Sequence, residues 1–324
     1  MTSRKEAVEN APRVAVSIVG GGPWGLALAA AAARTGPVVL VSRRTVDGAL
    51  PEGVTVTSDY AAIGKTRLVV LAVPSAVAPE VAATLGDHVD GSHYVVHGVR
   101  GLVGEEMQTV SDLVRQRTPV KRVGALGGPA LASDLLGGLP SVLVSGSRFP
   151  EVNEALTGAF GSRTLRVYST PDLKGLEWAS ALVGCLAIAI GFAEGLSTSP
   201  GLVAALICRS MGEAARIAAA AGGDERTILG LSGYGDLLAS IEQHDRPEVR
   251  FGRALARGLS VTQAKDEAQQ RLEAIELIPR VVAWCDANKV RAPIFGALRA
   301  IVLDNLPASE ILAQLMSMPM KEGA

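Results

Sequence analysis

Apolar residues follow two patterns along the chain, and the pattern changes near residue 170. The first half contains short, continuous apolar runs separated by segments of helical length. These runs are residues 14–19 (VAVSIV), 38–41 (VVLV), 68–73 (LVVLAV), 94–96 and 142–144, and an alanine-rich segment spans 26–34. Runs of this length predict buried strands, and their alternation with helical segments predicts a parallel sheet with crossover helices.

After residue 170 the apolar periodicity is helical almost throughout. Helices are expected at 172–197, 200–221, 225–230, 247–257, 261–288, 293–303 and 308–315. The apolar stretch 178–193 is shorter than the roughly 20 residues that span a membrane, which favours a buried central helix. A chain of 324 residues is long enough for two cores. We therefore expect a disordered lead-in at 1–12, an α/β domain at 13–170 and an all-α substrate and dimerisation domain at 171–324.

A glycine-rich sequence, Gly20-Gly-Gly-Pro-Trp-Gly25, lies between the first predicted strand and the first predicted helix. At this spacing Gly20 permits a tight turn, Gly22 lets the backbone approach a pyrophosphate, and Gly25 lets the helix pack close to the strand. The helix N-terminus then faces the phosphates. In this context the motif predicts a Rossmann-type dinucleotide-binding domain.

The end of the second predicted strand bears on the choice of cofactor. An acidic residue there would bind the ribose hydroxyls of NAD. The chain instead has Ser42, Arg43 and Arg44. A small residue followed by arginines favours the 2′-phosphate of NADP. NAD stays an alternative, because two arginines also suit a solvated turn.

Composition and charge narrow the possible partners. Lys plus Arg number 31, Asp plus Glu number 32, and aromatic residues make up 4%. Without a basic surplus or stacking residues, no nucleic-acid partner is expected. The polar N-terminus does not resemble a secretory signal, and no Cys or His spacing predicts a metal site. Cys185, Cys208 and Cys285 lie in apolar stretches and are expected to be buried free thiols in a cytoplasmic protein with no membrane association.

Several motifs together resemble the NAD(P)-dependent glycerol-3-phosphate dehydrogenase family. They are residues 20–29 (GGGPWGLALA), 71–75 (LAVPS), 128–132 (GPALA), 138–140 (GLP), 175–177 (GLE), 233–236 (GYGD), 250–252 (RFG) and 315–321 (LMSMPMK). The resemblance covers nearly the whole chain. It implies a Rossmann domain followed by an all-helical substrate domain, an active site between them, hydride transfer between a nicotinamide and an alcohol or ketone, and a homodimer.

The resemblance implies that the cofactor site is retained. Gly22, Trp24, Arg43, Ala132 and Glu273 occupy positions that contact the nucleotide in the family. Pro23 replaces a small polar residue, which removes one donor to phosphate. The complete set of expected cofactor-binding residues is Gly20, Gly22, Pro23, Trp24, Gly25, Arg43, Arg44, Val73, Pro74, Arg100, Ala132 and Glu273.

The substrate site departs from the family pattern. The family's proton-transferring lysine and the asparagine after it fall on Val183 and Gly184, and its second lysine falls on Arg100. Valine cannot transfer a proton, and arginine is a poor proton donor at neutral pH. The family's Ser-Arg-Asn run falls on Arg246-Pro247-Glu248. A carboxylate about 4 Å from a phosphate would oppose binding by roughly 4 kcal/mol at an effective dielectric of 20.

Four residues are candidates for the substrate chemistry: Arg100, His97, Asp236 and Tyr234. His97 ends a predicted strand and is either a general acid or a histidine bonded to backbone. Arg100 is expected to orient substrate or cofactor, and Asp236 is an expected substrate residue that the chain retains. Tyr234 is a proton donor or a packing residue. Lys174 and Glu177 share a helix face and are expected to pair at the surface or at the domain hinge.

Three functions are compatible with this pattern. The first is an NADP(H)-dependent oxidoreductase of the glycerol-3-phosphate dehydrogenase type that acts on a carbonyl, imine or alcohol other than glycerol 3-phosphate. The second is a true glycerol-3-phosphate dehydrogenase with compensating residues. The third is a catalytically silent nucleotide-binding protein. The expected partners are a small-molecule substrate and a second copy of the chain.

Overall fold

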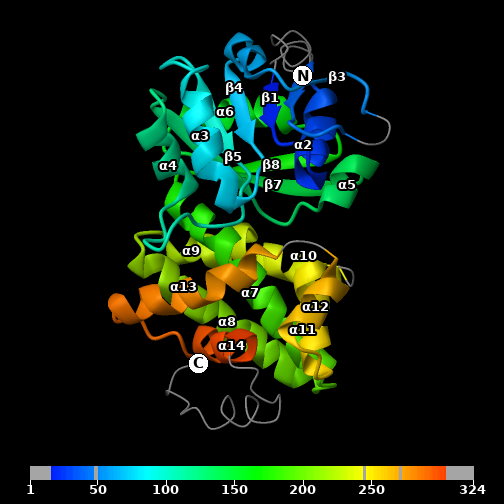
Figure 1. Cartoon of the computed structure of the whole chain (residues 1–324), viewed down its shortest axis with the longest axis vertical. Coiled ribbons are helices and arrows are strands. Elements are labelled where there is room, and N and C mark those ends of the chain that lie inside the picture. Colours follow the sequence, from blue (N-terminus) through cyan, green and yellow to red (C-terminus); the bar gives the residue numbers. More distant parts are fainter. Residues whose placement is uncertain (1–15, 47–49, 244–245, 270–271, 304–324) are drawn as a thin grey trace, which may run out of the picture.

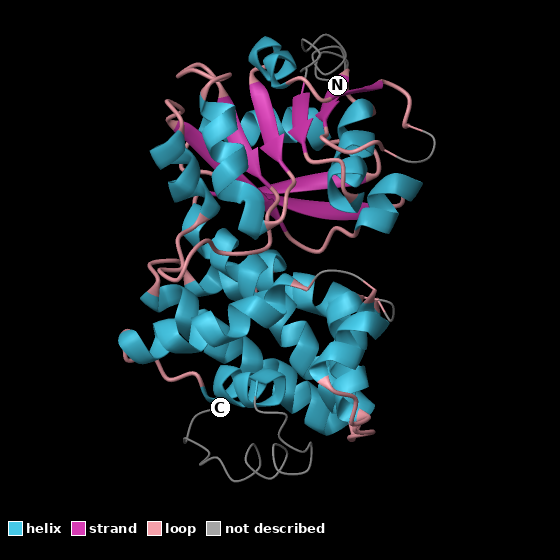
Figure 2. Cartoon of the chain, viewed as in Figure 1, coloured by secondary structure: helices cyan, strands magenta, loops and turns pink. Residues whose placement is uncertain are grey.

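The computed structural model describes residues 16–46, 50–243, 246–269 and 272–303. Along the longest axis a mixed helix-and-sheet part lies above a helical part (Figure 1), and all the strands lie in the upper part (Figure 2). The last strand ends at Thr170, and the first helix of the lower part begins at Leu173. The lead-in expected at 1–12 and the helix expected at 308–315 lie outside the described residues.

One eight-stranded sheet organises the upper part, in the order β3-β2-β1-β4-β5-β6-β7-β8. The strands are β1 Val16–Val19, β2 Val38–Val41, β3 Val54–Thr57, β4 Leu68–Leu71, β5 Tyr94–His97, β6 Arg122–Gly127, β7 Ser141–Gly146 and β8 Leu165–Thr170. All neighbouring strands are parallel except β6 and β7. The predicted Rossmann-type sheet is confirmed, with one antiparallel junction that the sequence did not predict.

Helices cover both faces of this sheet. Helices α2 (Pro23–Ala33), α5 (Ala132–Gly137) and α6 (Pro150–Phe160) share an apolar cluster with one face. Helices α3 (Ala78–Gly86) and α4 (Val110–Arg117) share a cluster with the other. The residues of β1, β4 and β5 are buried throughout. Burial on both faces explains why these strands are continuous apolar runs in the sequence.

The lower part is helical, as expected. Its elements are α7 Leu173–Gly195, α8 Pro200–Ala220, α9 Glu225–Leu229, the π-helical turn η3 Leu231–Gly235, α10 Asp236–Glu242, α11 Pro247–Ala256, α12 Val261–Ala268, α13 Glu273–Ala287 and α14 Pro293–Leu303. The helix expected at 261–288 is two helices, since Gln269 ends α12 in a left-handed conformation (φ 57°).

Helix α7 is the central helix of the lower part. By length and composition it is apolar enough to cross a membrane. However, 89% of its most apolar 18-residue segment is buried inside the described structure. The expectation of a buried central helix is therefore confirmed. Cys185 on α7 and Cys285 on α13 are buried as expected. The prediction for Cys208 was wrong: it is exposed, because its side of the amphipathic helix α8 faces away from the core.

Helix α11 crosses α7 at close range, and this contact fixes the position of the residues at its N-terminus. A Cβ added at Gly191 of α7 would lie 2.3 Å from the carbonyl oxygen of Val249. A Cβ added at Gly252 of α11 would lie 2.2 Å from the carbonyl oxygen of Ile188. The two backbones approach this closely only because both positions are glycine.

Glu213 of α8 is a buried acid that caps α14. Its side chain is 1% exposed and accepts hydrogen bonds from the backbone N–H groups of Ile294 (3.1 Å) and Phe295 (2.9 Å). Burial raises the pKa of Glu213 from 4.5 to about 7, although the two hydrogen bonds oppose this shift. Between these two values the folded chain binds more protons than the unfolded chain, so stability falls as the pH rises through this window.

We expect the free energy of unfolding to decline by about 3 kcal/mol between pH 4.5 and pH 7 because of this one group. Glu213→Gln, which cannot ionise, should remove most of that decline in urea titrations across the window. Glu154→Gln, at an exposed position of α6, is the control and should keep it. An unchanged pH slope in Glu213→Gln would contradict the assignment.

Candidate active site

The glycine turn between β1 and α2 has the geometry that its spacing predicts. Gly20 has a φ of 124°, and a Cβ there would lie 2.2 Å from the carbonyl oxygen of Ala72. A Cβ at Gly25 would lie 1.8 Å from the carbonyl oxygen of Gly20. A Cβ at Gly22 would meet nothing within 4 Å. Two glycines therefore close the turn, and the third leaves open space at the N-terminus of α2, where a phosphate would bind.

A cleft runs from this turn to the helical part. It lies at the carboxyl ends of β1, β4 and β5, beside the switch point where the strand order reverses, the usual ligand site of such sheets. Eight of the expected cofactor residues line it: Gly22, Pro23, Trp24, Val73, Pro74, Arg100, Ala132 and Glu273. Ala181, Gly184, Arg246 and Glu248 line it from the helical part. The cleft therefore brings together residues that lie far apart in the sequence.

Two buried polar atoms at this cleft have no partner among the described residues. They are Nε1 of Trp24, a donor, and Oε2 of Glu273, an acceptor. The other oxygen of Glu273 accepts a hydrogen bond from the backbone N–H of Ser75 at 3.0 Å, which fixes the carboxylate. Buried polar groups normally have partners, so an unpaired donor and acceptor fit a polar ligand such as a dinucleotide.

Arg43 and Arg44 lie outside the cleft, in the exposed turn after β2. Ser42 shapes this turn: its hydroxyl donates to the carbonyl of Arg44 at 2.8 Å. Arg43 forms an exposed ion pair with Glu80 of α3 at 3.0 Å. Neither arginine is buried, so both guanidinium groups are accessible to a ligand.

A chain of alternating charges connects the two parts of the molecule across the cleft. Arg100 binds both oxygens of Asp236, at 3.0 and 2.9 Å, and the Asp236 side chain is fully buried. Arg246 lies 3.8 Å from Asp236, donates to the hydroxyl of Ser240, and bonds Oε2 of Glu248 at 3.0 Å. The structure thus joins two of the four predicted substrate residues, Arg100 and Asp236. Arg246 and Glu248 extend this series of charged side chains to the start of α11.

The positions of the missing lysine and asparagine differ in their surroundings. Val183 is 1% exposed and packs in the core of the helical part, whereas Gly184 lines the cleft. A Cβ at Gly184 would have only Ala274 Cβ at 3.7 Å and Glu248 Oε1 at 3.8 Å near it. Here the cleft wall has open space and a carboxylate oxygen.

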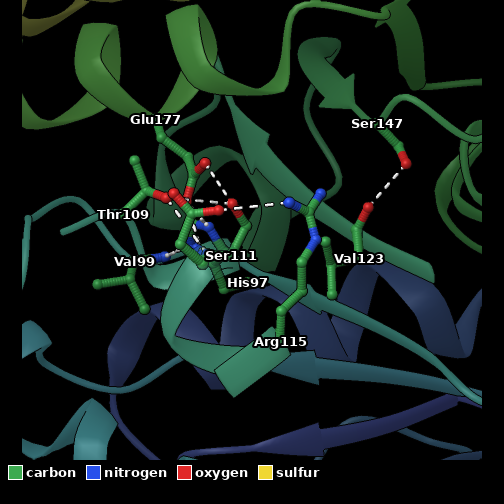
Figure 3. Close-up of polar contacts among 9 residues, drawn as sticks. His97, Val99, Thr109, Ser111, Arg115, Val123, Ser147 and Glu177 are labelled. Carbon is green, nitrogen blue, oxygen red and sulfur yellow. Dashed lines mark hydrogen bonds and ion pairs between the residues drawn. The ribbon is translucent and has the colours of Figure 1, made fainter. Parts of the chain in front are cut away.

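His97 is buried behind the cleft and is not among the residues that line it. Its Nδ1 accepts from the backbone N–H of Val99 at 3.3 Å, which places the proton of the neutral ring on Nε2. Nε2 then donates to Glu177 of α7 at 2.8 Å. Glu177 also accepts from Ser111, from its N–H at 2.8 Å and its hydroxyl at 2.7 Å (Figure 3).

Glu177 therefore joins the two parts of the molecule, but it binds His97 and Ser111 rather than the expected Lys174. The sequence suggested a pair with Lys174 at the surface or at the hinge. The carboxylate is instead 3% exposed and binds β5 and the start of α4. Nothing local in the sequence marks Ser111 as its partner, 66 residues away. Tyr234, in the π-helical turn η3, is half-buried and packs against the helical core, outside the cleft lining.

A Rossmann sheet, an open glycine turn and a cleft with unpaired polar atoms are the features of a dinucleotide-binding protein. Comparison with known proteins gives the family. The model of the NAD-dependent glycerol-3-phosphate dehydrogenase N-terminus matches residues 43–153, and that of the C-terminus matches residues 172–313. The chain therefore belongs to the glycerol-3-phosphate dehydrogenase family and is an NAD(P)-dependent dehydrogenase.

Relatives and solved structures agree with this assignment. A Rhizobium etli protein named glycerol-3-phosphate dehydrogenase (NAD(P)+) is 31% identical over 322 residues, covering 94% of this chain and 98% of its own. The Coxiella burnetii glycerol-3-phosphate dehydrogenase structure has a TM-score of 0.87 at 25% identity, covering 94% of this chain and 99% of that one. A Saccharomyces cerevisiae structure of the same name shares the fold, with a TM-score of 0.83 at 20% identity.

Proposed function

We propose that the protein is an NADP(H)-dependent oxidoreductase that transfers hydride to or from a carbonyl, imine or alcohol other than glycerol 3-phosphate. The observation that carries the proposal is the charge chain of the cleft. Arg100 is bonded to Asp236 and Arg246 to Glu248, so the four charges balance and neither guanidinium group is free for a phosphate. A doubly charged phosphate would have to displace a buried carboxylate or lie beside Glu248, and both are unfavourable.

The cofactor residues fit a dinucleotide, and each has a proposed role. When bound, the nicotinamide supplies or accepts the hydride. Gly22 and the N-terminus of α2 would hold the pyrophosphate, and Trp24 Nε1 would be an additional donor to the cofactor. Glu273 Oε2 would accept a hydrogen bond from a donor of the cofactor. Arg100 orients substrate or cofactor, held in place by Asp236. His97 and Glu177 position the loop from Val99 to Arg100, and Tyr234 has a packing role.

Purified protein assayed for NADPH oxidation tests the proposal. We expect turnover with some members of a panel of carbonyls and imines, and none with dihydroxyacetone phosphate. Efficient reduction of dihydroxyacetone phosphate would establish the second hypothesis, a glycerol-3-phosphate dehydrogenase with compensating residues. Tight NADPH binding with no turnover over the whole panel would establish the third, a silent nucleotide-binding protein.

The preference for NADP is proposed from Arg43 and Arg44. We expect Arg43→Gln to raise the KM for NADPH about tenfold and to leave the KM for NADH nearly unchanged, because a lost ion pair with the 2′-phosphate affects only NADPH. Glu80→Gln should lower the KM for NADPH, since it releases Arg43 from its exposed ion pair. Equal losses for both cofactors in Arg43→Gln would show that Arg43 does not recognise the 2′-phosphate.

We further propose a cytoplasmic homodimer.

A further inference from the structure

Besides Glu273 Oε2, a second carboxylate oxygen of the cleft has no hydrogen-bond partner among the described residues. In the chain of charges, Asp236 binds Arg100, and Glu248 Oε2 binds Arg246. No described donor bonds the second oxygen, Glu248 Oε1, although the side chain is only 21% exposed. Pro247 and Glu248 occupy the first turn of α11, where the helix dipole stabilises the ionised carboxylate. This series of charges therefore ends in a carboxylate that lines the cleft, with Oε2 paired to Arg246 and Oε1 without a hydrogen bond from a described donor.

The space beside this charge is open. Glu248 Oε1 lies 3.8 Å from the position that a Cβ would take on Gly184, and both residues line the cleft. A side chain larger than hydrogen at position 184 would occupy this space. A partly buried carboxylate oxygen without a hydrogen bond can accept one from a cationic group of a ligand in the cleft.

The described lining of the cleft has four titratable side chains, Arg100, Arg246, Glu248 and Glu273, and both carboxylates already accept a hydrogen bond, from Arg246 and from the Ser75 N–H. It contains no Lys, His, Tyr, Cys, Ser or Thr side chain, and Val183 stands where the family has its proton-transferring lysine. Reduction of a ketone produces an alkoxide, which needs a proton from such a group. A protonated imine carries that proton on nitrogen before hydride transfer, so its reduction needs no acid from the protein.

Resting on the function proposed above, we propose that the substrate is a small imine in its protonated form, or the corresponding amine in the reverse direction, and that Glu248 binds its cationic nitrogen. In reduction, the iminium carbon accepts the hydride that NADPH supplies. The π electron pair of the C=N bond becomes the lone pair of nitrogen, which keeps its proton. The imine gains two electrons, NADPH loses two, and the neutral amine takes a further proton from water.

Two measurements test this assignment. The first compares NADPH oxidation with pyrroline and piperideine against cyclopentanone and cyclohexanone, which have the same ring sizes and no nitrogen. The second measures, by calorimetry on the NADP-bound protein, the binding of pyrrolidine against cyclopentanol. We expect the imines to exceed the ketones by about tenfold or more in kcat/KM, and pyrrolidine to bind about tenfold more tightly than cyclopentanol.

Glu248→Gln keeps the shape and the bond to Arg246 but removes the charge. It should reduce kcat/KM for the imines about tenfold more than for the ketones, and it should remove the preference for pyrrolidine. Glu242→Gln, an exposed position of α10, is the matched control and should keep both preferences. NADPH binding, followed by tryptophan fluorescence, confirms that each variant is folded.

The outcomes separate this inference from the function on which it rests. Reduction of ketones as fast as imines, or equal losses for both in Glu248→Gln, would overturn the role of Glu248 and leave the oxidoreductase assignment standing. Equal binding of pyrrolidine and cyclopentanol would also overturn it. Failure of the proposed function itself would look different: either efficient turnover of dihydroxyacetone phosphate, or NADPH binding without turnover of any imine or ketone.

Discussion

Replacing Glu177 by alanine is expected to lower the free energy of unfolding by about 3–5 kcal/mol. The carboxylate accepts hydrogen bonds from three buried donors: Nε2 of His97, and the N–H and hydroxyl of Ser111. Alanine leaves His97 Nε2 and the Ser111 N–H without a described partner, whereas the Ser111 hydroxyl keeps Thr109 Oγ1 at 3.3 Å, and each unpaired buried donor is destabilising by about 1–3 kcal/mol. The donors belong to β5 and to the start of α4, so the contact between the upper and lower parts should weaken as well.

Urea unfolding of three variants measures this effect. Glu177→Gln keeps the side-chain volume and one acceptor oxygen, so its loss should be clearly smaller than that of Glu177→Ala. Glu194→Ala removes a carboxylate from the same helix, where it forms a partly exposed ion pair with Arg253 (side chains 24% and 29% exposed). This control should lose about 1 kcal/mol or less. Similar losses for Glu177→Ala and Glu194→Ala would show that the buried network contributes little.

Much of the fold follows from local sequence patterns, because the central strands are buried on both faces. Their apolar runs, such as 68–71 and 94–97, are recognisable for this reason. Three strands escaped prediction. Strands β3 and β8 lie at the edges of the sheet and alternate apolar with polar residues over a short length. Strand β6 includes Gly124 and Gly127, and glycine is unfavourable in strands.

The wall of the cleft formed by the glycine turn was also predictable, but the wall formed by the helical part was only partly so. The glycine turn is a local motif, and its three glycines have the predicted geometry. The pair of Arg100 and Asp236 joins residues 136 positions apart, and no spacing rule gives such a contact. In the sequence, Pro247 and Glu248 replace two residues of the family's Ser-Arg-Asn run, and this replacement indicated only that the phosphate pocket is lost. In the structure Pro247 opens helix α11, and the Glu248 carboxylate bonds Arg246 in the first turn.

The glycine turn provides a pair of substitutions that separate cofactor binding from folding. Gly25→Ala should fail to fold or lose more than about 3 kcal/mol of stability, because its Cβ would lie 1.8 Å from the carbonyl oxygen of Gly20, a backbone atom that cannot move aside. Gly22→Ala should keep its stability to within about 1 kcal/mol. Gly22 has an extended conformation (φ −78°, ψ 176°) that alanine adopts readily, and its Cβ would meet nothing within 4 Å.

The open space at Gly22 is nevertheless the space that we assign to the pyrophosphate. A methyl group there should weaken NADPH binding by about tenfold or more, since it keeps the phosphates from the N–H groups of α2. Thermal unfolding and calorimetric titration of both variants with NADPH give the two readouts. A Gly22→Ala protein that binds NADPH with unchanged affinity would place the cofactor elsewhere. An unstable Gly22→Ala protein would mean that the space is needed for folding rather than for the ligand.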